Sequence, residues 1–107
     1  MGTMFAIGAD KWAGISKLNE EAGEVIQVIG KLMATYGVTA HWEGTDLAER
    51  LEDEMGDVLA AIDFVLMHNQ SPLSAKKVME RRAEKLALFN KWHDEQRSLE
   101  TTTRKDL

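Results

Sequence analysis

Cysteine is absent from this chain, and proline occurs once, at Pro72. Without cysteine the protein has no disulfide bridge, no thiolate nucleophile and no cysteine-ligated zinc. Aromatic residues make up only 7% of the chain, but hydrophobic residues make up 44% and charged residues 29%. This balance is typical of a folded chain with a modest core rather than of a disordered one.

The chain also lacks an excess of basic residues and has no long hydrophobic run. The 18 acidic residues outnumber the 13 basic ones and give a net charge of -5, which argues against a nucleic-acid polymer or an anionic membrane as partner. A small phosphate-bearing ligand remains compatible, because a bound divalent metal would reverse the local charge. The beginning of the chain has no basic region followed by a long apolar run, and no later run could span a bilayer. We therefore expect a cytoplasmic protein without a membrane partner.

Apolar residues recur with the helical period in three stretches of the 107-residue chain. The stretches run from about Asp10 to Tyr36, from Asp46 to about Asn69, and from Pro72 to Trp92 or slightly beyond. No stretch alternates with period two, so the sequence predicts an all-α fold. We expect one domain over residues 1–97 and a flexible tail over residues 98–107. Wide apolar faces on so few helices favour a helical bundle whose core is completed by dimerisation.

Turn and capping residues punctuate these stretches. Gly37 stands where a helix end often takes a left-handed conformation, and Asp46 is a predicted helix cap. Ser71 and Pro72 are predicted as the cap and the first residue of the third helix. Gly23, flanked by acidic residues, is a candidate for a close approach by a backbone or a ligand.

Acidic residues form two short clusters, Glu20-Glu21-Ala22-Gly23-Glu24 and Glu54-Met55-Gly56-Asp57. In each cluster two carboxylates are three residues apart, so both project from one helix face. If the two helices pack antiparallel, as their short connection favours, both acidic flanks fall on the same edge of the pair. A single pair of this kind is usually a solvated face, but two matching pairs of oxygen donors suit Mg²⁺ or Mn²⁺.

A basic pair lies in the third stretch. Its inward face is predicted from Val78, Met79, Leu86 and Phe89, with Arg82 near the middle of that face and Lys85 beside it. Arg82 either forms an internal salt bridge or binds phosphate, for which a guanidinium is well suited.

These residues resemble the MazG-like group of all-α nucleoside triphosphate pyrophosphohydrolases. The family motif, Glu-Glu-x-x-Glu followed by Glu-x-x-Asp, is matched by the two acidic clusters. Two further segments resemble the family sequences, Lys17-Leu18-Asn19 and Asp57-Val58-Leu59-Ala60-Ala61. The predicted third helix, with its basic and aromatic residues, resembles them as well. The resemblance covers about residues 10 to 95.

The resemblance implies a Mg²⁺ site, with Mn²⁺ as a substitute, and hydrolysis of a nucleoside triphosphate to the monophosphate and pyrophosphate. The implied metal ligands are Glu21, Glu24, Glu54 and Asp57. Glu20 would complete the metal shell or orient the attacking water, and Arg82 and Lys85 would hold the leaving pyrophosphate. Further expected substrate contacts are Lys17, Trp42 and His68. The implied partner state is a homodimer or a dimer of dimers.

Other functions are also compatible with the sequence. A related enzyme specific for dUTP, dCTP or phosphoribosyl-ATP would share the fold and the metal site. A helical oligomerisation or regulatory module with solvated acids would have no activity at all. Stabilisation by Mg²⁺ separates the module from the enzymes, because only a real site gains stability from the metal.

Overall fold

Three α-helices make up the fold of the computed structural model, which describes residues 7–8, 10–40 and 46–106. Helix α1 spans Ile15–Ala34, α2 spans Leu47–His68 and α3 spans Ala75–Asp106. No strand occurs among the described residues, whose only β-type pairing is an isolated bridge between Ala40 and Asp46. The predicted all-α fold is confirmed. None of the helices in this part of the chain is long and apolar enough to cross a membrane.

The start of α1 is fixed by residues that precede the helix. Asp10 Oδ2 accepts hydrogen bonds from the backbone N–H of Ser16 (2.9 Å) and from its hydroxyl (2.7 Å). Gly14 has a left-handed φ of 81°, which interrupts the helical backbone directly before Ile15. The expected start near Asp10 was therefore wrong, because Asp10 acts as a capping side chain and not as a helical residue.

Helix α1 ends in a left-handed turn. Gly37 has a φ of 88° and donates its N–H to the carbonyl of Leu32 at 2.8 Å. Tyr36 also has a positive φ, of 55°, so the helix ends at Ala34 and not at Tyr36 as expected. The left-handed conformation predicted for Gly37 is confirmed, and it satisfies a carbonyl that the helix end would otherwise leave free.

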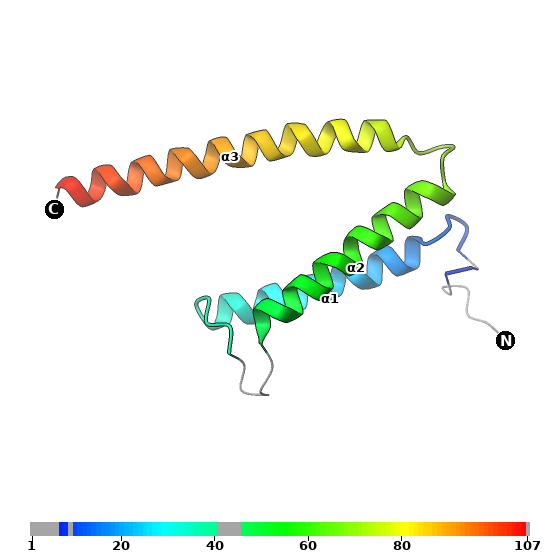
Figure 1. Ribbon diagram of the computed structural model, residues 1–107, viewed down its shortest axis with the longest axis horizontal. Coiled ribbons are helices and arrows are strands. Elements are labelled where there is room, and N and C mark those ends of the chain that lie inside the picture. The colour runs from blue at the N-terminus through cyan, green and yellow to red at the C-terminus, as the bar shows by residue number, and fades with distance from the viewer. Residues whose placement is uncertain (1–6, 9, 41–45, 107) are drawn as a thin grey trace. The chain divides into compact units, whose positions relative to one another are not determined.

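Helices α1 and α2 lie side by side and antiparallel (Figure 1). Helix α2 begins as predicted, because Asp46 caps it by accepting a hydrogen bond from the N–H of Ala48 at 2.8 Å. The buried side chains of the described residues all belong to these two helices: Val28, Leu47, Ala61 and Val65. This small core fixes the face that each helix turns toward the other.

Helix α3 belongs to a second compact unit, Ser74–Leu107, whereas α1 and α2 belong to the unit Met1–Leu73. The helix begins later than expected, because Ser74 accepts a hydrogen bond from the N–H of Lys77 (3.2 Å) and acts as the cap, while Ser71 and Pro72 lie in the connection. It continues to Asp106, so the expected end near Trp92 was wrong. The flexibility expected of residues 98–107 and the dimerisation stay predictions.

Candidate metal centre

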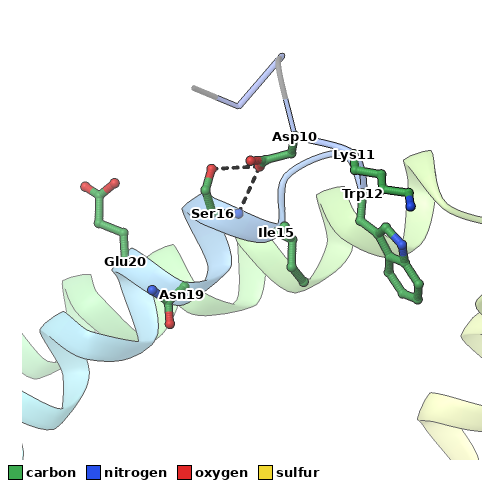
Figure 2. Close-up of a pocket in the computed structure, with 7 residues that line it drawn as sticks. All are labelled: Asp10, Lys11, Trp12, Ile15, Ser16, Asn19 and Glu20. Carbon is green, nitrogen blue, oxygen red and sulfur yellow. Dashed lines mark hydrogen bonds between the residues drawn. The ribbon is translucent and has the colours of Figure 1, made fainter. Parts of the chain in front are cut away.

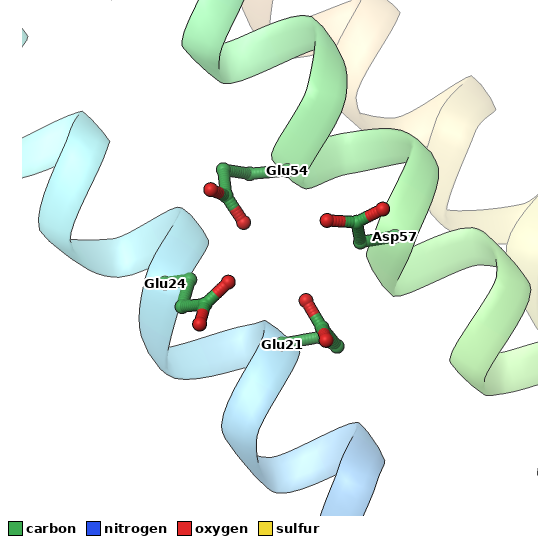
Figure 3. A group of neighbouring side chains, drawn as sticks. All are labelled: Glu21, Glu24, Glu54 and Asp57. Carbon is green, nitrogen blue, oxygen red and sulfur yellow. The ribbon is translucent and has the colours of Figure 1, made fainter.

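Four carboxylates from α1 and α2 meet at one edge of the helix pair (Figure 3). They belong to Glu21, Glu24, Glu54 and Asp57, and one oxygen of each lies within 4.8 Å of the oxygens of the other three. The convergence expected from the sequence is confirmed. It follows from the two spacings of three residues and from the antiparallel packing, which brings the flanks of both helices to the same edge.

Two oxygens of this cluster are buried without a hydrogen-bond partner in the described structure, Glu21 Oε2 and Glu54 Oε2. A buried acceptor with no donor loses its hydration and gains nothing in return. Asp57, by contrast, is exposed, so the cluster is open to solvent on its side. The cluster is thus an arrangement of negative charge that a bound cation would stabilise.

The pKa values of two of the acids reflect this crowding. A hydrogen bond to Glu24 is the main reason why the pKa of Glu54 is raised, with burial and the other acids adding to it. Two ionised carboxylates have no proton to share, so this bond forms only when one of the pair is protonated. Burial, followed by the charges of Glu24 and Asp57, raises the pKa of Glu21.

The donor set fits a hard divalent cation. Carboxylate oxygens are the ligands that Mg²⁺ and Mn²⁺ prefer, and opposite ligand oxygens around Mg²⁺ lie about 4.2 Å apart. The four oxygens already lie within 4.8 Å of one another, so only a small inward movement is needed to place them around one ion. A bound cation would also give the unpartnered oxygens of Glu21 and Glu54 the partner that they lack.

Comparison with protein families supports this interpretation. The model of the MazG nucleotide pyrophosphohydrolase domain matches residues 13–91, which include both acidic pairs. The chain belongs to the MazG family. No curated protein matches it, and no solved structure does either. Membership supports a hydrolase that acts on nucleotides, and members of this family are typically metal-dependent.

The MazG motif has a further acid, Glu20, which the structure places outside the cluster. Its Oε2 accepts a hydrogen bond from Lys17 Nζ at 3.0 Å on the surface of α1. This hydrogen bond, followed by the charge of Glu20, raises the pKa of Lys17, and the charges of Glu21 and Glu24 add to it. Lys17 is therefore a cation beside the acidic edge, and Glu20 is its partner.

Of the other residues expected to contact substrate, His68 lies apart from the cluster, and Arg82 and Lys85 belong to the second unit. His68 ends α2, with its ring centroid 4.2 Å from that of Phe64. It is about 16 Å along the helix from Asp57, at a rise of 1.5 Å per residue. Arg82 and Lys85 belong to α3 and hence to the second unit, and Trp42 lies outside the described residues. Their roles in substrate binding stay predictions.

Sequence reasoning missed the anchors that hold the segment before α1. Asn69 Nδ2 donates hydrogen bonds to the carbonyls of Ala13 (2.9 Å) and Val65 (2.7 Å), which ties this segment to the end of α2. A close approach within the chain occurs at Gly14, where an added Cβ would lie 2.5 Å from Phe64 Cδ1. The close approach of a ligand suggested at Gly23 stays a prediction. At Gly23 no described atom other than those of its chain neighbours and the adjacent backbone of α1 lies within 4 Å of an added Cβ. An asparagine directly after a helix is the only signal in the sequence that pointed to this anchoring.

Proposed function

We propose that this protein is a Mg²⁺-dependent nucleoside triphosphate pyrophosphohydrolase, with Mn²⁺ as a possible substitute for Mg²⁺. It would convert a ribo- or deoxyribonucleoside triphosphate and water into the monophosphate and pyrophosphate, as part of nucleotide-pool house-cleaning in the cytoplasm. The observation that carries the proposal is the cluster of four carboxylates, two of which have a buried oxygen without a partner. Its position in a MazG domain supports the assignment.

Each acid of the cluster has a role in this proposal. Glu21 and Glu24 on α1 and Glu54 and Asp57 on α2 hold the metal between the helices. When bound, the metal supplies charge neutralisation for the phosphates and a lowered pKa for a bound water. The exposed side of Asp57 leaves room for the triphosphate to enter. The water oxygen bonds to the α-phosphorus as the bond from that phosphorus to the α,β-bridging oxygen breaks. Pyrophosphate leaves with the bridging oxygen, and the proton of the attacking water passes to the solvent.

Cationic side chains complete the proposed site. Lys17 lies next to the acidic edge, where its ammonium can meet a phosphate oxygen, and Glu20 holds it in place. Arg82 and Lys85 bind the leaving pyrophosphate, because guanidinium and ammonium groups suit phosphate oxygens. Trp42 and His68 contact the rest of the substrate. The active form is a homodimer or a dimer of dimers, which would cover the apolar side chains that α1 and α2 leave exposed, such as Ile26 and Leu59.

Pyrophosphate release from a panel of nucleoside triphosphates tests the proposal. Glu21→Gln and Asp57→Asn each remove a metal-binding charge with little change of shape, and each should lower the rate by at least about 100-fold, since metal ions contribute several kcal/mol to such reactions. Asp53→Asn is the matched control on the exposed side of α2, and it should keep the activity of the parent protein. Circular dichroism checks that all variants are folded.

Undiminished hydrolysis in both cluster variants would falsify the proposal. Turnover confined to dUTP, dCTP or phosphoribosyl-ATP would instead identify a narrower pyrophosphatase with the same metal site. The absence of both Mg²⁺ binding and nucleotide turnover would favour the regulatory module with solvated acids.

A further inference from the structure

A cavity of about 790 Å³ opens at the start of α1, within the same unit as the carboxylate cluster (Figure 2). Its wall is mostly apolar and consists of the segment before the helix and the first turns of the helix. The side chains that matter here are Trp12, Ile15, Asn19 and Glu20. Small-molecule sites in proteins typically have volumes of about 300–1,000 Å³ and apolar walls with a few polar groups.

The segment that carries Trp12 is held at three points. Asp10 binds Ser16 of α1, and the carbonyl of Trp12 accepts a hydrogen bond from the N–H of Ile15 at 3.1 Å. The carbonyl of Ala13 accepts a hydrogen bond from Asn69. Although its backbone is so firmly held, the Trp12 side chain is 40% exposed. The fold therefore presents this indole at the cavity wall instead of burying it in the core.

A continuous row of side chains links the cavity to the carboxylate cluster. Ser16, Glu20 and Glu24 are spaced four residues apart and so lie along one side of α1. The row begins in the cavity wall and ends in the cluster. Its length is about 12 Å, at 1.5 Å per residue, which is a distance that a nucleotide spans between its base and its phosphates.

We propose that this cavity is the nucleobase subsite, with the base stacked on Trp12 and its edge hydrogen-bonded to the amide of Asn19. This proposal rests on the proposed function, because it places the triphosphate at the carboxylate cluster. Indole offers the largest aromatic face of any side chain for stacking on a base. The amide of Asn19 offers both donors and an acceptor, and it has no hydrogen bond within the described structure. Asn19 is then the residue that discriminates between bases.

Steady-state kinetics with the preferred nucleoside triphosphate tests the stacking. Trp12→Ala should raise KM by about 10-fold or more and change kcat little, because base stacking contributes to binding and not to the chemical step. Trp12→Phe keeps a smaller ring, so its KM should lie between that of the parent protein and that of Trp12→Ala. Trp92→Ala, which removes an exposed tryptophan of α3, is the matched control and should leave KM unchanged. Asn19→Ala should change the ratio of kcat/KM between bases.

A ligand without a base separates recognition of the base from a general loss of structure. Inorganic triphosphate with Mg²⁺ should bind Trp12→Ala as tightly as it binds the parent protein. An unchanged KM in Trp12→Ala, or an equal loss of triphosphate affinity in that variant, overturns the proposal.

Fluorescence keeps the test independent of hydrolysis. The test uses a Trp42→Phe background, because Trp42 is itself a proposed substrate contact. In this background a nucleoside monophosphate should quench the tryptophan emission, also when Trp92→Phe is added, but not when Trp12→Phe is added. Quenching that persists in Trp12→Phe overturns the subsite whether or not the protein hydrolyses nucleotides. Hydrolysis that fails while Trp12-dependent quenching remains overturns only the proposed function.

Discussion

Replacing Gly14 by alanine should destabilise the protein more than any other glycine substitution in α1 or at its start. The φ of 81° at Gly14 is a left-handed conformation, which costs a residue with a Cβ about 1–2 kcal/mol. An added Cβ would also lie 2.5 Å from Phe64 Cδ1 and 3.3 Å from Val65 Cγ2, so the packed side chains must move, at about 1–3 kcal/mol. The expected loss in the free energy of unfolding is therefore about 2–5 kcal/mol, a large part of the stability of a small domain.

Urea unfolding followed by circular dichroism measures this loss, and the midpoint should fall by about 1 M or more. Gly30→Ala is the matched control, because Gly30 is inside α1 and an added Cβ there would meet no described atom within 4 Å beyond its chain neighbours and the adjacent helix backbone. This substitution should stabilise the protein by about 0.5–1 kcal/mol. In a Phe64→Ala background, Gly14→Ala should cost less, mainly the left-handed part of about 1–2 kcal/mol, because only the 3.3 Å contact with Val65 remains. A Gly14→Ala protein as stable as the parent would refute the close contact between the start of α1 and α2.

Three further predictions concern the charged residues. Mg²⁺ should raise the melting temperature of the parent protein and of Glu52→Gln but not of Glu54→Gln, and equal shifts in all three would contradict a site at the cluster. Without metal, the free energy of unfolding should fall as the pH rises above 4.5, because the raised pKa values of Glu21 and Glu54 mean that the folded state holds more protons than the unfolded chain. Urea titrations of the parent protein across this pH range measure the fall. A constant free energy of unfolding would count against crowding of the four carboxylates. Arg82→Ala should weaken the binding of nucleoside triphosphate measured by calorimetry, and a change in stability alone would exclude the phosphate role.

The carboxylate cluster could be predicted from the sequence because its geometry depends on local rules. A spacing of three residues sets the direction of each pair, and a short connection sets the antiparallel packing. The structure sets Glu20 apart, because its Oε2 pairs with Lys17 Nζ on the surface of α1. The structure adds what no spacing shows, namely that one oxygen of Glu21 and one of Glu54 are buried without a partner.

Helix boundaries were harder to predict because long-range contacts and side-chain hydrogen bonds decide them. The start of α1 depends on the contact of Gly14 with Phe64, a residue of α2. In α3, the run of threonines after Ser98 favoured an early end, yet Thr101 Oγ1 donates a hydrogen bond to the carbonyl of Arg97 at 3.0 Å within the helix. The hydroxyl of Thr101 is thus satisfied within the helix, which the sequence alone did not show.

The small core holds α1 and α2 together, whereas the carboxylates of the acidic cluster repel one another across the same two helices. The stability of the helix pair therefore depends on both. Only four side chains of the described residues are buried, so α1 and α2 have little apolar burial to offset the repulsion among four converging carboxylates. A cation at the cluster would remove that repulsion and join the helices at the edge where they repel each other. Metal binding should therefore stabilise the helix pair as well as supply its chemistry, because a ligand that binds only the folded state shifts the folding equilibrium toward that state, and the shift grows with the ligand concentration relative to Kd.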